Sequence, residues 1–238
     1  MDNLKKSFKS LNIYEWVMAG IMIIIAASVM AKSFINPSDS GNPAWLDVIN
    51  FISSVCGVFC IFFCARASIS NFGFGLVNTV VYIIYLAYWK IYGTMCLEIF
   101  VYFPINIISW VLWAKHRDGG RKEITMAKRL KLWQDLVILA IVLMSACIYH
   151  NILVRIGGNV AWLDAFTVAI GVIATILEMY RYSEQYMLWI ITDIIAVAMF
   201  IVHFDPVYLT KKSIYLVMAI AGLINWCKLN RERNLENA

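Results

Sequence analysis

The stretch Gly41-Asn42-Pro43-Ala44-Trp45-Leu46-Asp47 returns later in the chain as Gly158-Asn159-Val160-Ala161-Trp162-Leu163-Asp164. Six of the seven positions are identical, and the copies lie 117 residues apart in a chain of 238. Each copy opens a long apolar run. The repeat predicts a membrane protein of two similar halves, and the axis between such halves is the natural place for a shared site, as in transporters.

The composition excludes a soluble globular domain. Hydrophobic residues make up 62% of the chain and charged residues 15%, and the mean hydropathy is +0.74. Soluble domains have about 45–50% apolar and about 25% charged residues. We therefore predict an all-α membrane protein with eight spans, at residues 14–32, 45–64, 72–90, 95–113, 133–150, 162–180, 186–203 and 213–229.

The basic residues predict the orientation of these spans. If the N-terminus is cytoplasmic, 15 of the 20 Lys and Arg residues lie in inner connectors and 5 lie outside, among them Lys211 and Lys212. This asymmetry favours two cytoplasmic termini. The net charge of +5 comes from these connectors, so it does not indicate a nucleic-acid partner.

The repeat also predicts the domain organisation. Residues 1–113 form the first half, 114–132 a basic connector, and 133–238 the second half. Four spans return the chain to its starting side, so the halves are expected to run parallel. At a spacing of 115 residues, Phe74 aligns with Trp189 and Asn78 with Asp193; Trp110 aligns with Trp226 at a spacing of 116.

Polar and aromatic residues recur at helical spacing inside several spans, where they are costly unless they face protein or water. From them we take nine candidate substrate-binding residues: Trp189, Asp193, Asn106, Tyr102, Asn78, Phe74, Gln185, Glu98 and Asn225.

Asp193 is open to three interpretations. It holds a substrate hydroxyl or cation, or it bonds a neighbouring helix in its protonated form, or it carries a coupling proton or ion. Trp189 lies one turn away, and an aromatic face beside a carboxylate suits a planar, cationic, hydroxylated ligand. The alternative for Trp189 is packing against Phe200. For Asn78 and Asn106 the alternative is hydrogen bonding between helices.

Other residues predict structural roles. Pro104 is expected to kink the fourth span, because it removes a backbone hydrogen bond. Trp16, Trp45, Trp113 and Trp162 lie near span ends, which is typical of interfacial anchors. Cys56, Cys60 and Cys64 share a helical face without a histidine, so we expect packing residues there and neither a metal site nor a cofactor.

Two longer motifs resemble a known family. Residues 102–113, Tyr-Phe-Pro-Ile-Asn-Ile-Ile-Ser-Trp-Val-Leu-Trp, resemble the first-half signature of the PnuC family of bacterial vitamin transporters. Residues 189–195, Trp-Ile-Ile-Thr-Asp-Ile-Ile, followed by Tyr215 and by Gly-Leu-Ile-Asn-Trp at 222–226, resemble the second-half signature. The likeness covers roughly 41–229.

The resemblance implies a core of three, one and three helices, similar to a full-length SWEET transporter, with an added N-terminal helix. It implies uptake of nicotinamide riboside across the bacterial inner membrane by facilitated diffusion with alternating access, and trapping of the product by a cytoplasmic riboside kinase. The family pocket carries over onto Trp189, Asp193, Tyr102 and Asn106. Assembly into a homo-oligomer is left open.

This chain departs from the family pattern at three positions. Asn106, Ser109 and Glu98 stand where the family commonly has Gln, Gly and Asn. Transport of thiamine, riboflavin or a deoxynucleoside therefore stays as an alternative. A remoter one is an intramembrane enzyme with Asp193 and Glu98 as an acid–base pair. No nucleophile or metalloprotease motif supports catalysis, so we predict a non-enzyme.

Overall fold

The computed structural model describes residues 2–35, 43–90, 92–117, 124–155, 161–202 and 206–236. The chain divides into two compact units, Met1–Thr125 and Met126–Ala238. Within the described ranges the structure is helical, and β pairing is limited to isolated bridges such as Ser68 with Ile124. The all-α class expected from the apolar runs is therefore confirmed. Residues 41, 42 and 158–160 of the repeated heptad lie outside the described residues.

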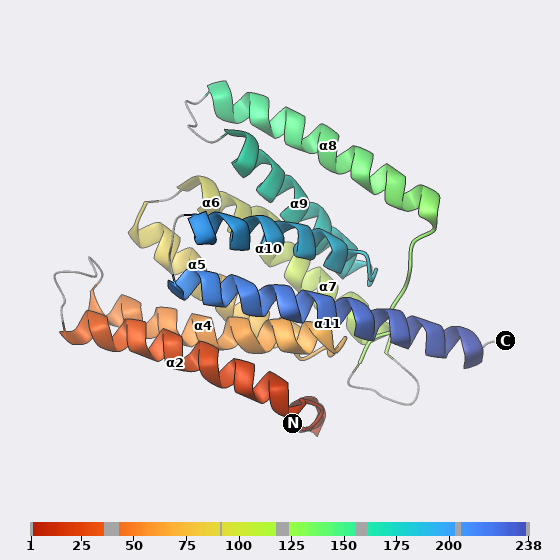
Figure 1. Cartoon of the computed structure of the whole chain (residues 1–238), viewed down its shortest axis with the longest axis horizontal. Helices are drawn as coiled ribbons and strands as arrows, with labels where there is room; N and C mark the ends of the chain where they lie inside the picture. Colours follow the sequence, from red (N-terminus) through yellow and green to blue (C-terminus); the bar gives the residue numbers. More distant parts are fainter. Residues whose placement is uncertain are drawn as a thin grey trace. The chain divides into compact units, whose positions relative to one another are not determined.

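The first unit begins with a short polar helix and continues with long apolar ones (Figure 1). Its elements are α1 (Asp2–Lys9), α2 (Ile13–Ile35), α4 (Ala44–Ala65), α5 (Asn71–Tyr88), α6 (Tyr92–Leu97), the π-helix η1 (Glu98–Tyr102) and α7 (Phe103–Lys115). Helix α4 packs between α2 and α5, and α5 also contacts α7.

The second unit consists of α8 (Leu132–Arg155), α9 (Ala161–Met179), α10 (Gln185–Val202) and α11 (Pro206–Glu236). Each helix packs on the next along the chain. A buried apolar cluster joins α8 to α9 through Val142, Ile170, Ile173 and Leu177. Because most of the helix surface is apolar, the helices are suited to lipid on their outer faces.

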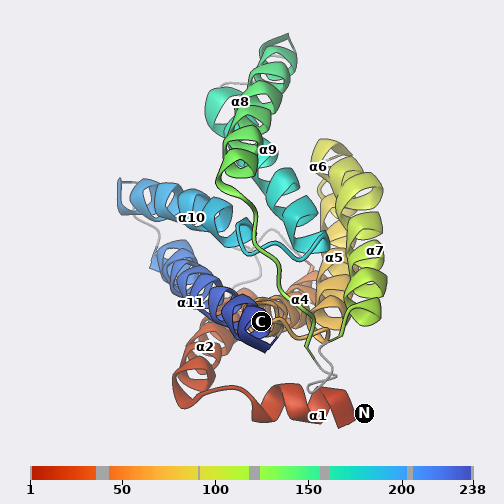
Figure 2. The same ribbon diagram turned by 90° about the vertical axis from the view of Figure 1, so that its right-hand side faces the viewer.

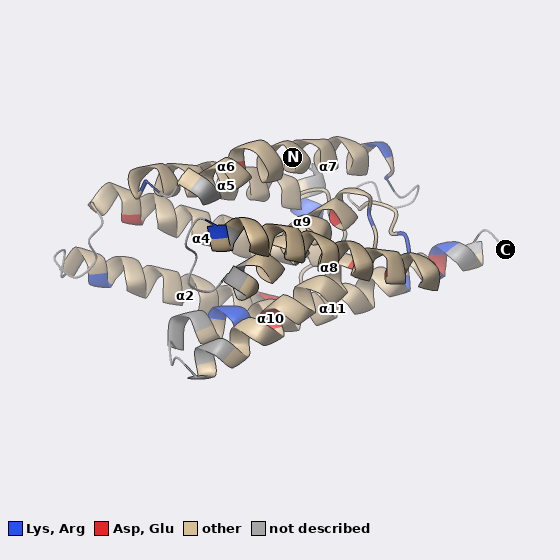
Figure 3. Cartoon of the chain, turned by 90° about the horizontal axis from the view of Figure 1, so that it is seen from above, with Lys and Arg blue, Asp and Glu red and all other residues tan. Residues whose placement is uncertain are grey.

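Six helical segments are long and apolar enough to cross a membrane: Ile13–Ile35, Ala44–Ala65, Asn71–Tyr88, Met95–Lys115, Leu132–Ile152 and Leu209–Arg233. They coincide with six of the predicted spans. The other two, 162–180 and 186–203, coincide with α9 and α10, whose described apolar stretches are shorter. Charged residues lie mostly toward helix ends in each unit (Figure 3).

Helix α1, which no apolar run predicts, packs on the first unit through one face (Figure 2). The Phe8 ring lies 5.1–6.2 Å from the rings of Phe63, Phe59 and Phe74. On the same helix, the Ser7 hydroxyl is 2.7 Å from that of Ser68. These contacts attach α1 to the turn between α4 and α5.

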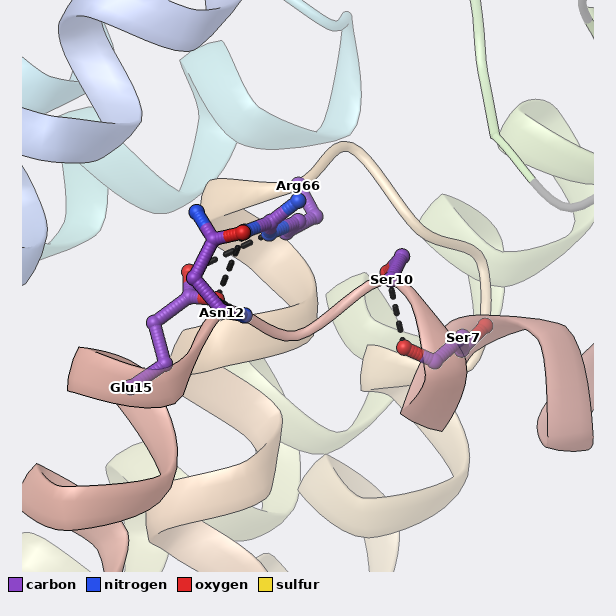
Figure 4. Close-up of polar contacts among 5 residues, drawn as sticks. All are labelled: Ser7, Ser10, Asn12, Glu15 and Arg66. Atoms are coloured by element: carbon purple, nitrogen blue, oxygen red, sulfur yellow. Dashed lines mark hydrogen bonds and ion pairs between the residues drawn. The ribbon is translucent and has the colours of Figure 1, made fainter.

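An ion pair fixes the start of α2 beside that turn. The buried Glu15 carboxylate accepts two hydrogen bonds from Arg66, at 2.6 and 3.1 Å (Figure 4). It also accepts one from the backbone N–H of Asn12, at 2.6 Å. Such a two-point contact between a guanidinium and a carboxylate fixes orientation as well as charge.

Each unit has a tight turn with a left-handed residue. In the first unit Ala67 has φ 54°, and its carbonyl accepts the N–H of Thr125 at 2.9 Å. In the second unit Arg181 has φ 69°, and its carbonyl accepts the N–H of Lys128 at 2.8 Å. A positive φ is unfavourable for residues other than glycine, so these local hydrogen bonds must stabilise the turn.

The expected role of Trp113 is wrong. Its ring is fully buried and lies edge-on to Phe72, with ring centroids 4.8 Å apart. It is a core residue of the first unit and not an interfacial anchor. Trp16, Trp45 and Trp162 are exposed, as anchors require.

Candidate functional site

Helix α10 carries three of the candidate residues at intervals of four. Gln185 opens the helix, Trp189 follows one turn later and Asp193 one turn after that, so they share a face. Gln185 and Asp193 are buried and Trp189 is half-buried. Polar side chains within a membrane span are costly in contact with lipid. We therefore expect this face of α10 to contact protein, water or a ligand.

Asp193 is paired with a lysine of the next helix. Its Oδ1 lies 3.0 Å from the Nζ of Lys212 on α11. Within the described part of the chain, its Oδ2 has no hydrogen-bond partner. The carboxylate therefore has its charge compensated and can still accept a hydrogen bond from a ligand hydroxyl.

Lys212 is a residue that sequence reasoning missed. We expected it in an outer connector, but α11 begins at Pro206 and includes both Lys211 and Lys212. The Lys212 side chain is partly exposed, and its ammonium lies 5.6 Å from the Tyr215 ring. The position of this lysine could have indicated its role. A lysine one turn before an apolar run can extend its side chain along the helix and place its ammonium at a polar site.

The Trp189 ring is only half-buried on this face of α10. Its backbone carbonyl accepts the hydroxyl of Thr192 at 2.8 Å, which belongs to ordinary helix geometry. No stacking or edge contact joins its ring to another aromatic ring among the described side chains. The alternative of packing against Phe200 falls on a side chain outside the described residues.

Gln185 is fully buried, and neither the oxygen nor the nitrogen of its side-chain amide has a hydrogen-bond partner among the described residues. A buried unsatisfied amide costs roughly 1–3 kcal/mol, so a ligand group that forms hydrogen bonds with it would recover most of that cost.

Asn225 is half-buried on α11, next to the fully buried Trp226. Trp226 packs edge-on against Tyr186 of α10, at 5.7 Å between centroids.

In the first unit, Asn106 lies where three helices meet. Its Nδ2 on α7 approaches Gly75 of α5 so closely that a Cβ there would be 2.9 Å away, and the same Cβ would be 3.2 Å from Cys60 Sγ on α4. The Asn106 Oδ1 is buried and has no hydrogen-bond partner in the part of the chain that the structure describes. One turn further along α5, Asn78 accepts a hydrogen bond of 2.6 Å from Ser53 of α4. Asn78 thus bonds a neighbouring helix, whereas Asn106 has a free acceptor.

Glu98 and Tyr102 are the first and last residues of a π-helical segment. The segment η1 ends directly before Phe103, whose N–H reaches the Glu98 carbonyl, and Pro104 follows in the first turn of α7. The helical span continues through the π turn into α7, and the wider π turn lies directly before the proline that was expected to kink this span. Single π turns are frequent at functional sites. Both side chains are half-buried.

Phe74 takes part in packing. Its ring lies 5.4–6.2 Å from the rings of Phe63, Phe59 and Phe8. In the residues described, no group of three or more His, Cys, Asp or Glu side chains is placed to hold a metal ion.

Comparison with known proteins identifies the family of this chain. The family model described as nicotinamide mononucleotide transporter matches residues 47–228. The chain belongs to the PnuC family of transporters. A curated relative, the nicotinamide riboside transporter PnuC of Neisseria mucosa, is 30% identical over 219 residues, which cover 88% of this chain and 80% of that protein. The same-named protein of Haemophilus influenzae is 31% identical over 218 residues, with 90% of each chain covered.

A solved structure agrees with this family. The crystal structure of the vitamin B3 transporter PnuC superimposes with a TM-score of 0.75 at 28% identity, over 98% of both chains. The chain is therefore a multi-pass membrane protein of a PnuC-type transporter family, and the prediction that it is not an enzyme is confirmed by the named relatives.

Proposed function

We propose that this PnuC-family chain takes up nicotinamide riboside across a bacterial inner membrane by facilitated diffusion with alternating access. A cytoplasmic riboside kinase then traps the product by phosphorylation. The observation that carries the proposal is the half-buried Trp189 beside the buried Asp193, within a chain 30–31% identical to two named nicotinamide riboside transporters. The bilayer and this small solute are the partners that the proposal requires.

Nicotinamide riboside has a flat pyridinium ring, an amide and a ribose. The ring would stack on Trp189, where cation–π attraction contributes about 0.5–2 kcal/mol. Because Lys212 already compensates the charge of Asp193, we assign Asp193 to the ribose hydroxyls through Oδ2. Gln185 has an amide with unpaired atoms that suits the carboxamide. Asn106, whose Oδ1 has no partner among the described residues, stays a further candidate substrate-binding residue. The same holds for Tyr102, Glu98, Asn78, Phe74 and Asn225.

We further propose eight spans, both termini in the cytoplasm, and a duplicated SWEET-like architecture with one half on each side of the connector 114–132. Support for the duplication comes from the two turns. In each, a left-handed residue accepts an N–H from residues 125–128. By that geometry Ala67 corresponds to Arg181, at a spacing of 114.

The second candidate is a transporter of thiamine, another flat cation with a hydroxyl. The shorter Asn106 and the acidic Glu98, both departures from the family pattern, favour keeping it as the alternative. Uptake assays with nicotinamide riboside, thiamine, riboflavin and deoxynucleosides separate these candidates.

Uptake into proteoliposomes tests the proposal. Labelled nicotinamide riboside is expected to equilibrate across the membrane, and proton or sodium gradients are expected to leave the plateau unchanged. Empty liposomes are the control. Accumulation above the external concentration would contradict facilitated diffusion, and uptake of thiamine without nicotinamide riboside would contradict the substrate.

A further inference from the structure

Among the described side chains, Arg181 is a buried cation that no carboxylate pairs with. It lies in the turn between α9 and α10, and only 4% of the residue's surface is exposed. Its guanidinium makes one hydrogen bond, from Nη1 to the Met126 carbonyl at 3.4 Å. Within the described ranges, no acidic side chain pairs with it. A desolvated charge of this kind is unfavourable unless an opposite charge reaches it.

Two more cations approach Arg181 from other elements. Lys128 comes from the connector and Arg233 from the last turns of α11. Burial is the largest cause that lowers the pKa of Arg181 and of Lys128, and repulsion from Arg233 lowers both further. Three positive charges are thus gathered from three segments of the second unit.

Local bonds hold this cluster in place. The Lys128 backbone donates to the Arg181 carbonyl at 2.8 Å, and its own carbonyl accepts the N–H and the hydroxyl of Ser183 at 3.0 and 2.7 Å. The Lys128 ammonium lies 5.7 Å from the Tyr182 ring. Arg233 donates to Asn230 at 3.2 Å. The backbones of Lys128 and Arg181 are therefore fixed side by side, which lowers the cost of binding an ion at these two residues.

The acids near the cluster pair with other cations. Glu184 accepts the N–H of Leu130 and lies 3.8 Å from Arg129. Glu232 lies 3.9 Å from Lys228. The first unit shows the opposite arrangement, because the arginine in its turn, Arg66, is neutralised by Glu15. Among the described residues, the arginine of the first turn thus pairs with an internal acid, and Arg181 does not.

We propose that Arg181, Lys128 and Arg233 form a binding site for a phosphate group. A guanidinium presents its N–H groups in a planar fork that matches phosphate oxygens, and an ammonium adds a point charge. A phosphate monoester carries up to two negative charges and a diester carries one, and both present non-bridging oxygens that several cationic donors can reach at once. The phosphate belongs either to an anionic lipid headgroup or to a soluble phosphate compound.

The test uses the purified full-length protein and its thermal unfolding. Two probes are added separately: inorganic phosphate in detergent without lipid, and phosphatidylglycerol nanodiscs compared with phosphatidylcholine nanodiscs. Sodium chloride at equal ionic strength is the reference. Either probe is expected to raise the unfolding temperature by about 3–6 °C at about ten times its Kd.

Variants identify the site. Lys128→Gln and Arg233→Gln, at partly exposed positions, are expected to lose most of this shift, and Arg181→Gln is added where it folds. Lys228→Gln is the matched control on α11, because its side chain is 72% exposed and pairs with Glu232. A shift with phosphate supports a soluble ligand, and a shift with phosphatidylglycerol alone supports a lipid headgroup. No shift with either probe, or equal shifts in the wild type and both glutamine variants, would overturn the proposal.

Discussion

Replacing Asp193 by Asn is expected to destabilise the protein by about 2–4 kcal/mol, because it leaves the Lys212 ammonium without its counter-charge inside the bundle. Lys212 is partly exposed, so the loss falls toward the lower end of the range for buried pairs. Unfolding of the purified protein in detergent measures it. The exposed pair Lys228–Glu232 on α11 is the control, and neutralising it is expected to change stability by less than about 0.5 kcal/mol.

The double variant Asp193→Asn with Lys212→Gln separates structure from binding. Removing both charges is expected to restore most of the lost stability, since no uncompensated ion remains. Ligand binding is not expected to return, because the carboxylate that would accept the ribose hydroxyls is absent. A double variant that binds nicotinamide riboside like the wild type would limit Asp193 to an architectural role.

Replacing Gly222 by Ala is expected to destabilise the second unit by about 1–3 kcal/mol. A Cβ at this position would lie 2.5 Å from Cε1 of Tyr186 and 2.7 Å from Cζ. The ring cannot withdraw easily, because it is buried and packs on Trp226. Helices α10 and α11 must therefore separate, which also disturbs the Asp193–Lys212 pair between them.

Gly73→Ala is the matched control for this effect. It lies inside helix α5, and a Cβ there meets nothing within 4 Å. Alanine is the better helix former by about 1 kcal/mol, so this variant is expected to be neutral or slightly more stable. Equal unfolding temperatures for the two variants would show that Gly222 is not needed for close packing.

Hydropathy predicted the apolar helices well, because a membrane span must be long, apolar and helical. The run at 45–64 coincides with α4 at Ala44–Ala65, and the run at 14–32 lies inside α2. Helix α1 was missed because its eight residues include only two apolar ones, Leu4 and Phe8, and so contain no apolar run. Its amphipathic packing depends on Phe8 meeting rings that are more than fifty residues away in the chain.

The candidate site was only partly predictable. Spacing placed Gln185, Trp189 and Asp193 on one face of α10, and the helix has that register. The partner of Asp193 was missed, because the two lysines lowered the local hydropathy and the predicted span began after them, whereas α11 begins at Pro206. Trp113 was misjudged because position near a span end does not reveal that Phe72 packs against it.

The most direct test of the account is calorimetric titration of the purified protein with nicotinamide riboside, for the wild type and for Trp189→Ala. We expect the wild type to bind and the variant to lose about 1–3 kcal/mol of binding free energy, or about 5- to 150-fold in Kd, since stacking and ring burial are both removed. Absence of binding to the folded wild type, or the same Kd in both proteins, would contradict it.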